Sequence, residues 1–214
     1  MRLFAAFSLS LALGTLAAPT NALAQRRTAP PTRAAQNAPV AVPAGTYALD
    51  PAHSNFNFSV QHMGLANVTG AFRDVAGTIT VGTGGLRTLR ATATAQATSI
   101  DTGVEARDNH LRTADFFDVA NHPLVTFEST GVTNVRGRFF RLNGRLTMHG
   151  VTRPVVLDAE YKGTVTQPAQ MGGKRLVGFV GRTTVNRNDF GISYGPDMIG
   201  RDVAIVLNVE AIQQ

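Results

Sequence analysis

Histidine and aspartate are the side chains best suited to acid–base chemistry in this 214-residue chain, which contains no cysteine. Four aspartates lie on either side of one histidine in the sequence: His110 with Asp101, Asp108, Asp115 and Asp118. A carboxylate beside an imidazole is a common acid–base pair. Two of these carboxylates fit helix-capping positions better, so we expect no catalytic residues in this segment.

The five histidines are scattered along the sequence: His53, His62, His110, His122 and His149. No two of them have the spacing of paired ligands on one helix, and the lack of cysteine excludes a thiolate metal site. A metal site would require the fold to bring distant residues together, for instance His62, His110 and Asp108. We expect no metal and no cofactor.

Residues 191–195 match the Gly-x-Ser-x-Gly pattern of serine hydrolases, with Ser193 at its centre. In those enzymes the serine lies between a strand and a helix, and the histidine partner follows later in the chain. Here Pro196 follows almost at once, and the last histidine, His149, precedes the serine. The sequence therefore favours a turn over a nucleophile, and we expect no enzyme.

The elements that must position these side chains are mostly strands. Apolar residues occupy every second place in many segments, which is typical of strands with one buried face. About eight strands are predicted, near residues 55–60, 78–81, 91–95, 124–129, 138–148, 154–165, 176–185 and 203–209. Turns or bulges are expected at Gly82 to Gly85, at Gly172 and Gly173, and at Asn143 and Gly144. The short links favour an antiparallel sheet.

One charged segment, residues 99–117, interrupts this pattern. Thr102 followed by Glu105 fits a capping box, which predicts a short helix to about Thr113. Asp115 fits the cap of another turn. We therefore expect an all-β fold, an eight-stranded antiparallel β-barrel with a short helical insert near residues 102–118. Eight closed strands leave an interior that side chains fill or that holds one small ligand.

The N-terminal segment has the features of an export signal. A positive start, an apolar run and a small-residue cleavage site predict a signal peptide at residues 1–24, and therefore a periplasmic protein. Residues 25–44 contain four prolines and three arginines and predict a flexible linker. Residues 45–214 are then one folded domain. We expect no stable membrane insertion.

The net charge of +6 would suggest a nucleic-acid partner, but its distribution does not. Residues 45–214 hold 16 basic and 14 acidic side chains, so the domain itself is nearly balanced. Four arginines alternate with apolar residues along one predicted strand: Arg136, Arg138, Arg141 and Arg145. We interpret them as the solvent-facing side of that strand and expect no nucleic-acid partner.

A series of motifs covers nearly all of residues 45–214. The most distinctive is Arg107-Asp-Asn-His-Leu111 followed by Asp115-Phe-Phe117, and the others lie at 50–54, 60–64, 68–72, 99–103, 123–129, 144–154 and 186–192. With these motifs the chain resembles the YceI-like family, bacterial polyisoprenoid-binding proteins with a lipocalin-like barrel. The absence of tryptophan rules out the Gly-x-Trp motif of true lipocalins.

The resemblance implies a barrel partly capped by a helix, with a long apolar tunnel for an isoprenoid-type or similar amphiphilic lipid, such as a polyprenyl compound, a quinone or a fatty amide. It also implies a periplasmic location, and it is compatible with a homodimer. A carrier or sequestering protein is the leading interpretation. A small lipid-modifying enzyme using the rim residues His110 and Asp108, and a stress-related interaction module, are the alternatives.

The ligand-binding residues expected from this reading fall into three groups. The wall of the tunnel is assigned to Phe56, Phe58, Phe72, Ile79, Phe127, Leu142 and Phe179. The mouth is assigned to Met63, Leu111, Phe116, Phe117, Phe190 and Ile192. The head group is assigned to His62, Arg107, His110 and Arg112, because a phosphate or a quinone oxygen needs hydrogen-bond donors. Alternatively, Arg107 and Asp108 form a salt bridge that fixes the helix to the barrel rim.

Overall fold

Alternating apolar and polar residues form eleven β-strand segments in residues 38–214, the part of the chain that the computed structural model describes. The predicted signal peptide and most of the predicted linker lie outside these residues. The strands are β1 (Gly45–Leu49), β2 (Asn55–His62), β3 (Ala66–Phe72), β4 (Val75–Val81), β5 (Arg90–Gln96), β6 (Ile100–Asp101), β7 (Leu124–Arg136), β8 (Phe139–Met148), β9 (Val151–Thr166), β10 (Arg175–Asn186) and β11 (Ile199–Gln213). The helices are α2 (Glu105–Leu111) and four 3₁₀ turns, η1 (Gly85–Thr88), η2 (Ala97–Ser99), η3 (Ala169–Met171) and η4 (Arg187–Phe190).

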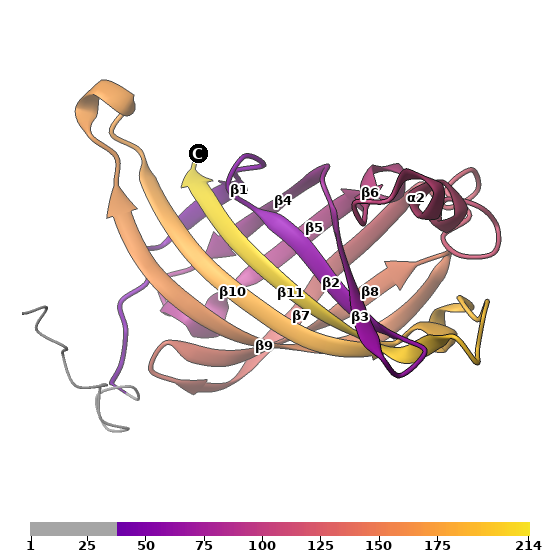
Figure 1. Cartoon of the computed structure of the whole chain (residues 1–214). Coiled ribbons are helices and arrows are strands. Elements are labelled where there is room, and N and C mark those ends of the chain that lie inside the picture. The colour runs from indigo at the N-terminus through magenta and orange to yellow at the C-terminus, as the bar shows by residue number, and fades with distance from the viewer. Residues whose placement is uncertain (1–37) are drawn as a thin grey trace, which may run out of the picture. The chain divides into compact units, whose positions relative to one another are not determined.

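Eight of these segments close into a ring. They pair in the order β1-β4-β5-β7-β8-β9-β10-β11, and β11 pairs in turn with β1 (Figure 1). Every pairing in this ring is antiparallel. The eight-stranded antiparallel barrel predicted from the sequence is therefore confirmed.

The other three segments, β2, β3 and β6, continue three strands of the ring. β1 and β2 pair with the same strand, because Leu49 lies opposite Ala211 and Asn55 lies opposite Asn208. In the same way β3 pairs with β2 and with β6, whereas β4 pairs with β1 and with β5. Three neighbouring barrel strands are thus each interrupted, at residues 50–54, 73–74 and 97–99.

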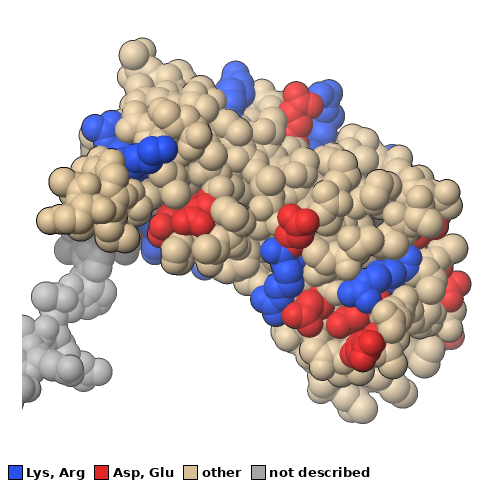
Figure 2. Space-filling model, turned by 90° about the horizontal axis from the view of Figure 1, so that it is seen from above, with Lys and Arg blue, Asp and Glu red and all other residues tan. Residues whose placement is uncertain are grey.

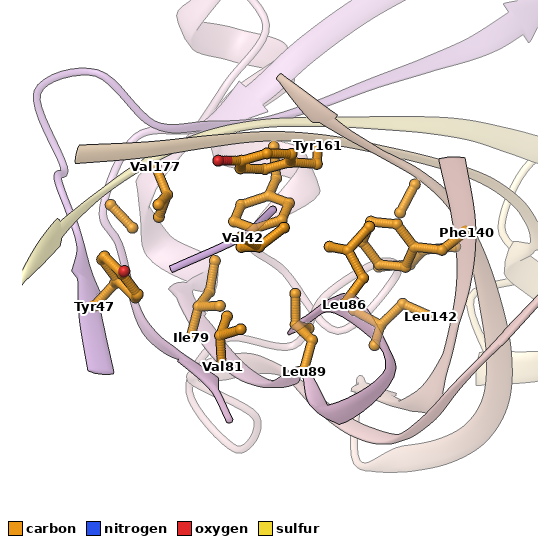
Figure 3. Close-up of a cluster of buried hydrophobic side chains, with 14 residues drawn as sticks. Val42, Tyr47, Ile79, Val81, Leu86, Leu89, Phe140, Leu142, Tyr161 and Val177 are labelled. Atoms are coloured by element: carbon orange, nitrogen blue, oxygen red, sulfur yellow. The ribbon is translucent and has the colours of Figure 1, made fainter. Parts of the chain in front are cut away.

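One half of the barrel is solidly packed. Figure 3 shows side chains from several strands pointing toward one another around Val42 and Leu86. We call this group the packed cluster: Val42, Tyr47, Ile79, Val81, Leu86, Leu89, Phe140, Leu142, Leu157, Ala159, Tyr161, Val177, Phe179 and Ala211. Val42 belongs to the segment predicted as a linker, and the Tyr47 hydroxyl donates to the Pro43 carbonyl over 2.9 Å. The folded core therefore begins a few residues before β1.

The helical insert lies at the other end of the barrel (Figure 1). The predicted capping box is wrong, because α2 begins at Glu105 with Val104 at the N-cap and no side-chain cap. The Thr102 hydroxyl donates instead to the buried Asp108 carboxylate, which also accepts the Thr102 backbone N–H over 2.9 Å. The carboxylate thus ties the helix to the end of β6.

β7 contains a β-bulge, which lies opposite Asn143 and Gly144 of β8. Ser129 pairs with Gly144 and Gly131 pairs with Asn143, so β7 carries one extra residue there. The bulge bends the strand and re-aims its side chains. The Phe127 ring, on the same strand, covers Gly144: a Cβ built on this glycine would lie 2.4 Å from two of the ring carbons.

We expect Gly144→Ala to lower the free energy of unfolding by about 2 kcal/mol, because the added methyl group clashes with the Phe127 ring and with the Glu128 backbone carbonyl. Thermal or urea denaturation measures the change. Gly131→Ala is the matched control, since a Cβ there meets nothing within 4 Å. Equal effects of the two substitutions would contradict the close packing of Phe127 on Gly144.

The outer surface carries both signs of charge. In Figure 2, basic and acidic side chains lie side by side in several places on the face shown, without a continuous basic stripe. Three arginines of the predicted solvent-facing row pair with acids of neighbouring strands: Arg138 with Glu160 (3.9 Å), Arg141 with Asp158 (3.2 Å) and Arg145 with Glu128 (2.9 Å). This supports their interpretation as a solvated strand face. Among the described residues, no helix is long and apolar enough to cross a membrane.

Candidate ligand-binding cavity

The half of the barrel next to α2 encloses a cavity of about 410 Å³. Residues of β2, β3, β8, β10 and β11 form its wall, and α2, the segment after it and the loop before β11 form its mouth. Small-molecule sites usually have roughly 300–1,000 Å³. The cavity is therefore large enough for a small ligand, and most of its lining residues are apolar.

A second void, of about 70 Å³, lies deeper in the barrel. Phe56 and Ile205 line both spaces, and the side chains around the smaller one include Phe127 and Leu157, which pack against or belong to the packed cluster. The interior is thus hollow beside α2, narrow in the middle and filled at the far end. The long tunnel implied by the family resemblance is therefore not observed in full: the large cavity occupies only the half of the barrel beside α2.

Most of the predicted binding residues come together around the larger cavity. Ten of them line it: Phe56, Phe58, Phe72, Leu111, Phe116, Phe117, Ile192, His62, Arg107 and His110. Their aromatic rings are in contact with one another, for instance Phe72 with Phe56 (5.3 Å between centroids) and with Phe117 (5.4 Å). As contacts to a ligand, these residues stay predictions.

The other predicted residues lie elsewhere. Ile79, Leu142 and Phe179 belong to the packed cluster, because alternation along a strand gives the side of the sheet but not the position along the barrel. Phe127 lines only the smaller void, and Phe190 is buried without lining either space. Met63 is 57% exposed beside the mouth, where its backbone N–H donates to Met198 over 2.7 Å. Arg112 lies outside the lining and is described below.

Twelve lining residues were not among those predicted: Val60, Gln61, Val68, Thr102, Met148, Val185, Arg187, Tyr194, Met198, Ile199, Val203 and Ile205. The valines on the strands and Ile205 point into the barrel. The alternation of apolar and polar residues along each strand could have identified them, as it identified the phenylalanines. Tyr194 and Met198 come from the irregular loop before β11. This loop has no alternating pattern from which the direction of its side chains could be predicted.

Two arginines and no carboxylate line the cavity. The first, Arg187, is only 4% exposed, and its guanidinium donates to four backbone carbonyls within 3.0 Å, those of Ile192, Tyr194, Ile199 and Gly200. It has no ion-pair partner among the described residues. Burial lowers the pKa of Arg187 from its usual value, but an arginine remains protonated. Its charge therefore adds to the positive potential inside an apolar space.

The second arginine, Arg107, holds α2 to the end of β6. Its Nε donates to the Thr102 hydroxyl over 2.7 Å, and its Nη2 donates to the Thr102 carbonyl over 2.9 Å. The predicted direct salt bridge with Asp108 is not among the ion pairs of residues 38–214, because both side chains bind Thr102 instead. Nη1 of Arg107 makes none of these bonds and is available to a ligand.

Arg112 has a similar anchoring role outside the cavity. Its Nε donates to the Thr98 carbonyl (2.8 Å), its Nη2 to the Ile100 carbonyl (2.9 Å) and its Nη1 to the Asn109 side chain (2.9 Å). All of its nitrogens thus have partners within the protein, and Arg112 does not line the cavity where a head group would lie.

His110 lies at the mouth within a group of aromatic rings. Its ring centroid is 5.0 Å from those of Phe116 and Tyr194, and its Nε2 lies 2.8 Å from an oxygen of Asp115. The acid beside His110 is therefore Asp115, not Asp108. The metal grouping of His62, His110 and Asp108 considered from the sequence does not form among residues 38–214. Ser193 is exposed, as expected of a turn residue.

A closed antiparallel barrel with an internal cavity under a helical segment defines a lipocalin-like protein. A family model described as YceI-like domain matches residues 47–211. The chain is 35% identical over 162 residues to a UPF0312 protein of Azotobacter vinelandii, covering 76% of this chain and 83% of that one. It is 36% identical over 162 residues to Protein YceI of Salmonella arizonae, with the same coverage of 76% and 83%. The chain therefore belongs to the YceI-like family.

Solved structures share the fold. Burkholderia cenocepacia BcnA superposes with a TM-score of 0.68 at 19% identity, covering 76% of this chain and 98% of that one. A Campylobacter jejuni YceI protein gives 0.62 at 27% identity, covering 72% and 90%. A polyisoprenoid binding domain from Saccharophagus degradans gives 0.60 at 15% identity, covering 78% and 98%. The lipocalin-like barrel predicted from the sequence is thus confirmed by comparison as well as by topology.

Proposed function

We propose that this protein binds and carries a long-chain amphiphilic lipid, such as a polyprenyl compound, a quinone or a fatty amide, with its tail in the cavity beside α2. The observation that carries the proposal is an apolar cavity of about 410 Å³ with arginine and histidine at its mouth and no acidic side chain in its lining. The polyisoprenoid binding domain that shares the fold supports the same class of ligand.

The apolar lining accounts for affinity without any catalytic group. Burying about ten methylene groups at ~0.8 kcal/mol each contributes on the order of 8 kcal/mol. Ordering of the chain reduces this gain. A free energy of about 8 kcal/mol corresponds to a dissociation constant near 1 μM. The tail thus provides most of the binding energy.

The charge of the lining favours a particular head group. Arg107 and Arg187 are both cationic, and the lining residues include no carboxylate to balance them. Hydrogen bonds between a guanidinium and a phosphate or carboxylate are the strong, charge-assisted kind. Because Arg187 donates to four carbonyls whereas Nη1 of Arg107 is available, we assign the head-group contact to Arg107.

The sequence predicts an export signal at residues 1–24. The periplasm is aqueous, so a lipid that crosses it needs a protein that shields its apolar tail from water. We therefore propose a periplasmic carrier that shields a lipid tail from water.

The test is native mass spectrometry of protein purified without detergent, followed by organic extraction. We expect one long-chain lipid per chain. Chemical conversion of that lipid during incubation would support a lipid-modifying enzyme instead, with His110 and Asp115 as the pair to examine. An empty protein that also fails to bind added farnesol or farnesyl phosphate would overturn the proposal.

Arg107→Gln should reduce the preference for an acidic head group. In the unsubstituted protein we expect farnesyl phosphate to bind about tenfold more tightly than farnesol, as one charge-assisted hydrogen bond implies. Calorimetric titration should show that the glutamine variant binds both about equally. Arg112→Gln is the matched control, since Arg112 anchors the same helix from outside the cavity. Loss of the preference in both variants would assign Arg107 a merely structural role.

A further inference from the structure

Two histidines that do not line the cavity, His122 and His149, lie together with Asp118 on the outside of its mouth. One possible ligand atom from each of these three side chains lies within 4.8 Å of those of the other two, and each residue is half-buried. The two imidazole rings are 5.2 Å apart between centroids, at 76°. The sequence separates these residues by up to 31 positions and gave no sign of the cluster.

Asp118 and His122 belong to one turn of the chain that follows α2. The His122 backbone N–H donates to the Asp118 carbonyl over 2.8 Å, which places residues four positions apart on the same side. Asp118 has a positive φ of 46°, and one of its carboxylate oxygens accepts from the Asn121 amide over 2.9 Å. That hydrogen bond orients the carboxylate and leaves its other oxygen available.

His149 occupies the tight turn between β8 and β9. Met148 pairs with Val151, and the two residues between them, His149 and Gly150, have φ of 51° and 74°. Asparagine, aspartate and glycine are the usual residues of such turns. A Cβ on Gly150 would lie 2.6 Å from the His122 ring, so this glycine gives His122 the space to approach.

The hydrogen bond of His149 determines which of its nitrogens is free. Its Nδ1 lies 3.0 Å from the Phe190 carbonyl, and a carbonyl only accepts, so Nδ1 carries the proton. In the neutral ring Nε2 is then the nitrogen with a free lone pair. Histidines that bind metals nearly always donate their other ring N–H to a carbonyl or a carboxylate in this way.

A second cluster of this kind, Asp50, His53 and Glu210, is less suited to a metal. His53 is already paired with Asp50 over 2.8 Å, and its side chain is 64% exposed. The hydrogen bond to Asp50 raises the pKa of His53, which favours the protonated ring. A metal needs the neutral ring, so binding there competes with a proton.

We infer that Asp118, His122 and His149 form a binding site for a divalent transition metal, with Zn²⁺ as the best match. Two imidazoles and one carboxylate are ligands typical of Zn²⁺ sites that leave a fourth position to water. At usual bond lengths of about 2.0–2.2 Å, tetrahedral ligand atoms lie roughly 3.3–3.6 Å apart. Small side-chain rotations bring the three residues from their present spacing to that geometry.

The site joins two segments that line the cavity. Phe116 and Phe117 lie just before Asp118, and Met148 lies just before His149. A metal bound by all three ligands links the segment after α2 to the β8–β9 turn. It therefore stabilises the mouth of the barrel, whether or not a lipid is bound.

The test uses tag-free, metal-stripped protein titrated with ZnCl₂ by calorimetry and by thermal unfolding. We expect one high-affinity Zn²⁺ per chain and a rise in Tm of roughly 5 °C in excess metal. His122→Gln and His149→Asn should each weaken binding at least tenfold, and asparagine keeps the turn conformation at position 149. His53→Ala, the matched control, should leave binding unchanged.

A crystallographic experiment locates the bound metal. Anomalous scattering at the zinc edge, from crystals soaked in ZnCl₂, should place one peak between Asp118, His122 and His149. The inference is overturned if no zinc binds, if binding survives both His122→Gln and His149→Asn, or if only His53→Ala abolishes it.

Discussion

Replacing Arg187 with alanine should lower the free energy of unfolding by about 4 kcal/mol, which corresponds to a fall in Tm of roughly 10 °C for a domain of this size. The guanidinium is buried and donates to the carbonyls of Ile192, Tyr194, Ile199 and Gly200. Removing it leaves these acceptors without their donor, and each unsatisfied buried group costs about 1–3 kcal/mol. Thermal and urea denaturation, followed by circular dichroism, measure the loss.

Two further variants separate the hydrogen bonds from the charge. Arg187→Lys keeps the charge but cannot direct donors to four carbonyls, so most of the loss should remain. Arg182→Ala, on the preceding strand β10, removes an exposed arginine and should change stability by less than about 0.5 kcal/mol. A lysine variant as stable as the original protein would show that these hydrogen bonds contribute little.

Filling the cavity should abolish lipid binding with little effect on the fold. Val203 lines the cavity from β11, and tryptophan at this position occupies the space that we assign to the lipid tail. We expect Val203→Trp to weaken farnesol binding at least a hundredfold and to remove any co-purifying lipid. Calorimetry and native mass spectrometry measure the two effects, and Tm should change by only a few degrees because the new side chain enters a void.

Ala204→Trp is the control, because this neighbouring residue is exposed. The chain has no native tryptophan, so fluorescence reports on each new indole separately. Blue-shifted emission is expected for Val203→Trp and solvent-like emission for Ala204→Trp. Retention of the same lipid by a folded Val203→Trp variant would place the binding site outside this cavity.

The barrel could be predicted because the same alternation of apolar and polar residues recurs in many segments of the chain. Alternation in segments such as residues 55–60 and 203–209 identifies strands locally, and a closed ring is the usual way to protect the edges of so many strands. The interrupted strands explain why eight were expected where eleven segments form. The helical insert was placed correctly, but its cap was not, since the partner of Thr102 is Asp108 inside the helix.

The candidate site was only partly predictable. Phe58 and Phe72 could be assigned to the inner face from their period, whereas Phe179 could not be distinguished from them although it lies in the packed cluster. Position along the barrel axis depends on how distant strands pair, and no local pattern contains that information. Arg187 was missed because its carbonyl partners lie in the irregular loop that follows it and at the start of β11, and no periodic pattern marks such a contact.

The packed cluster and the cavity occupy different halves of one barrel, and three strands are interrupted between them. Substitutions of the cavity-lining residues leave the packed cluster unchanged, because the two sets share no residue. Relatives with this architecture are therefore free to diverge in what they hold while keeping the same scaffold. Selection for a new cargo then acts outside the packed cluster, which keeps the scaffold.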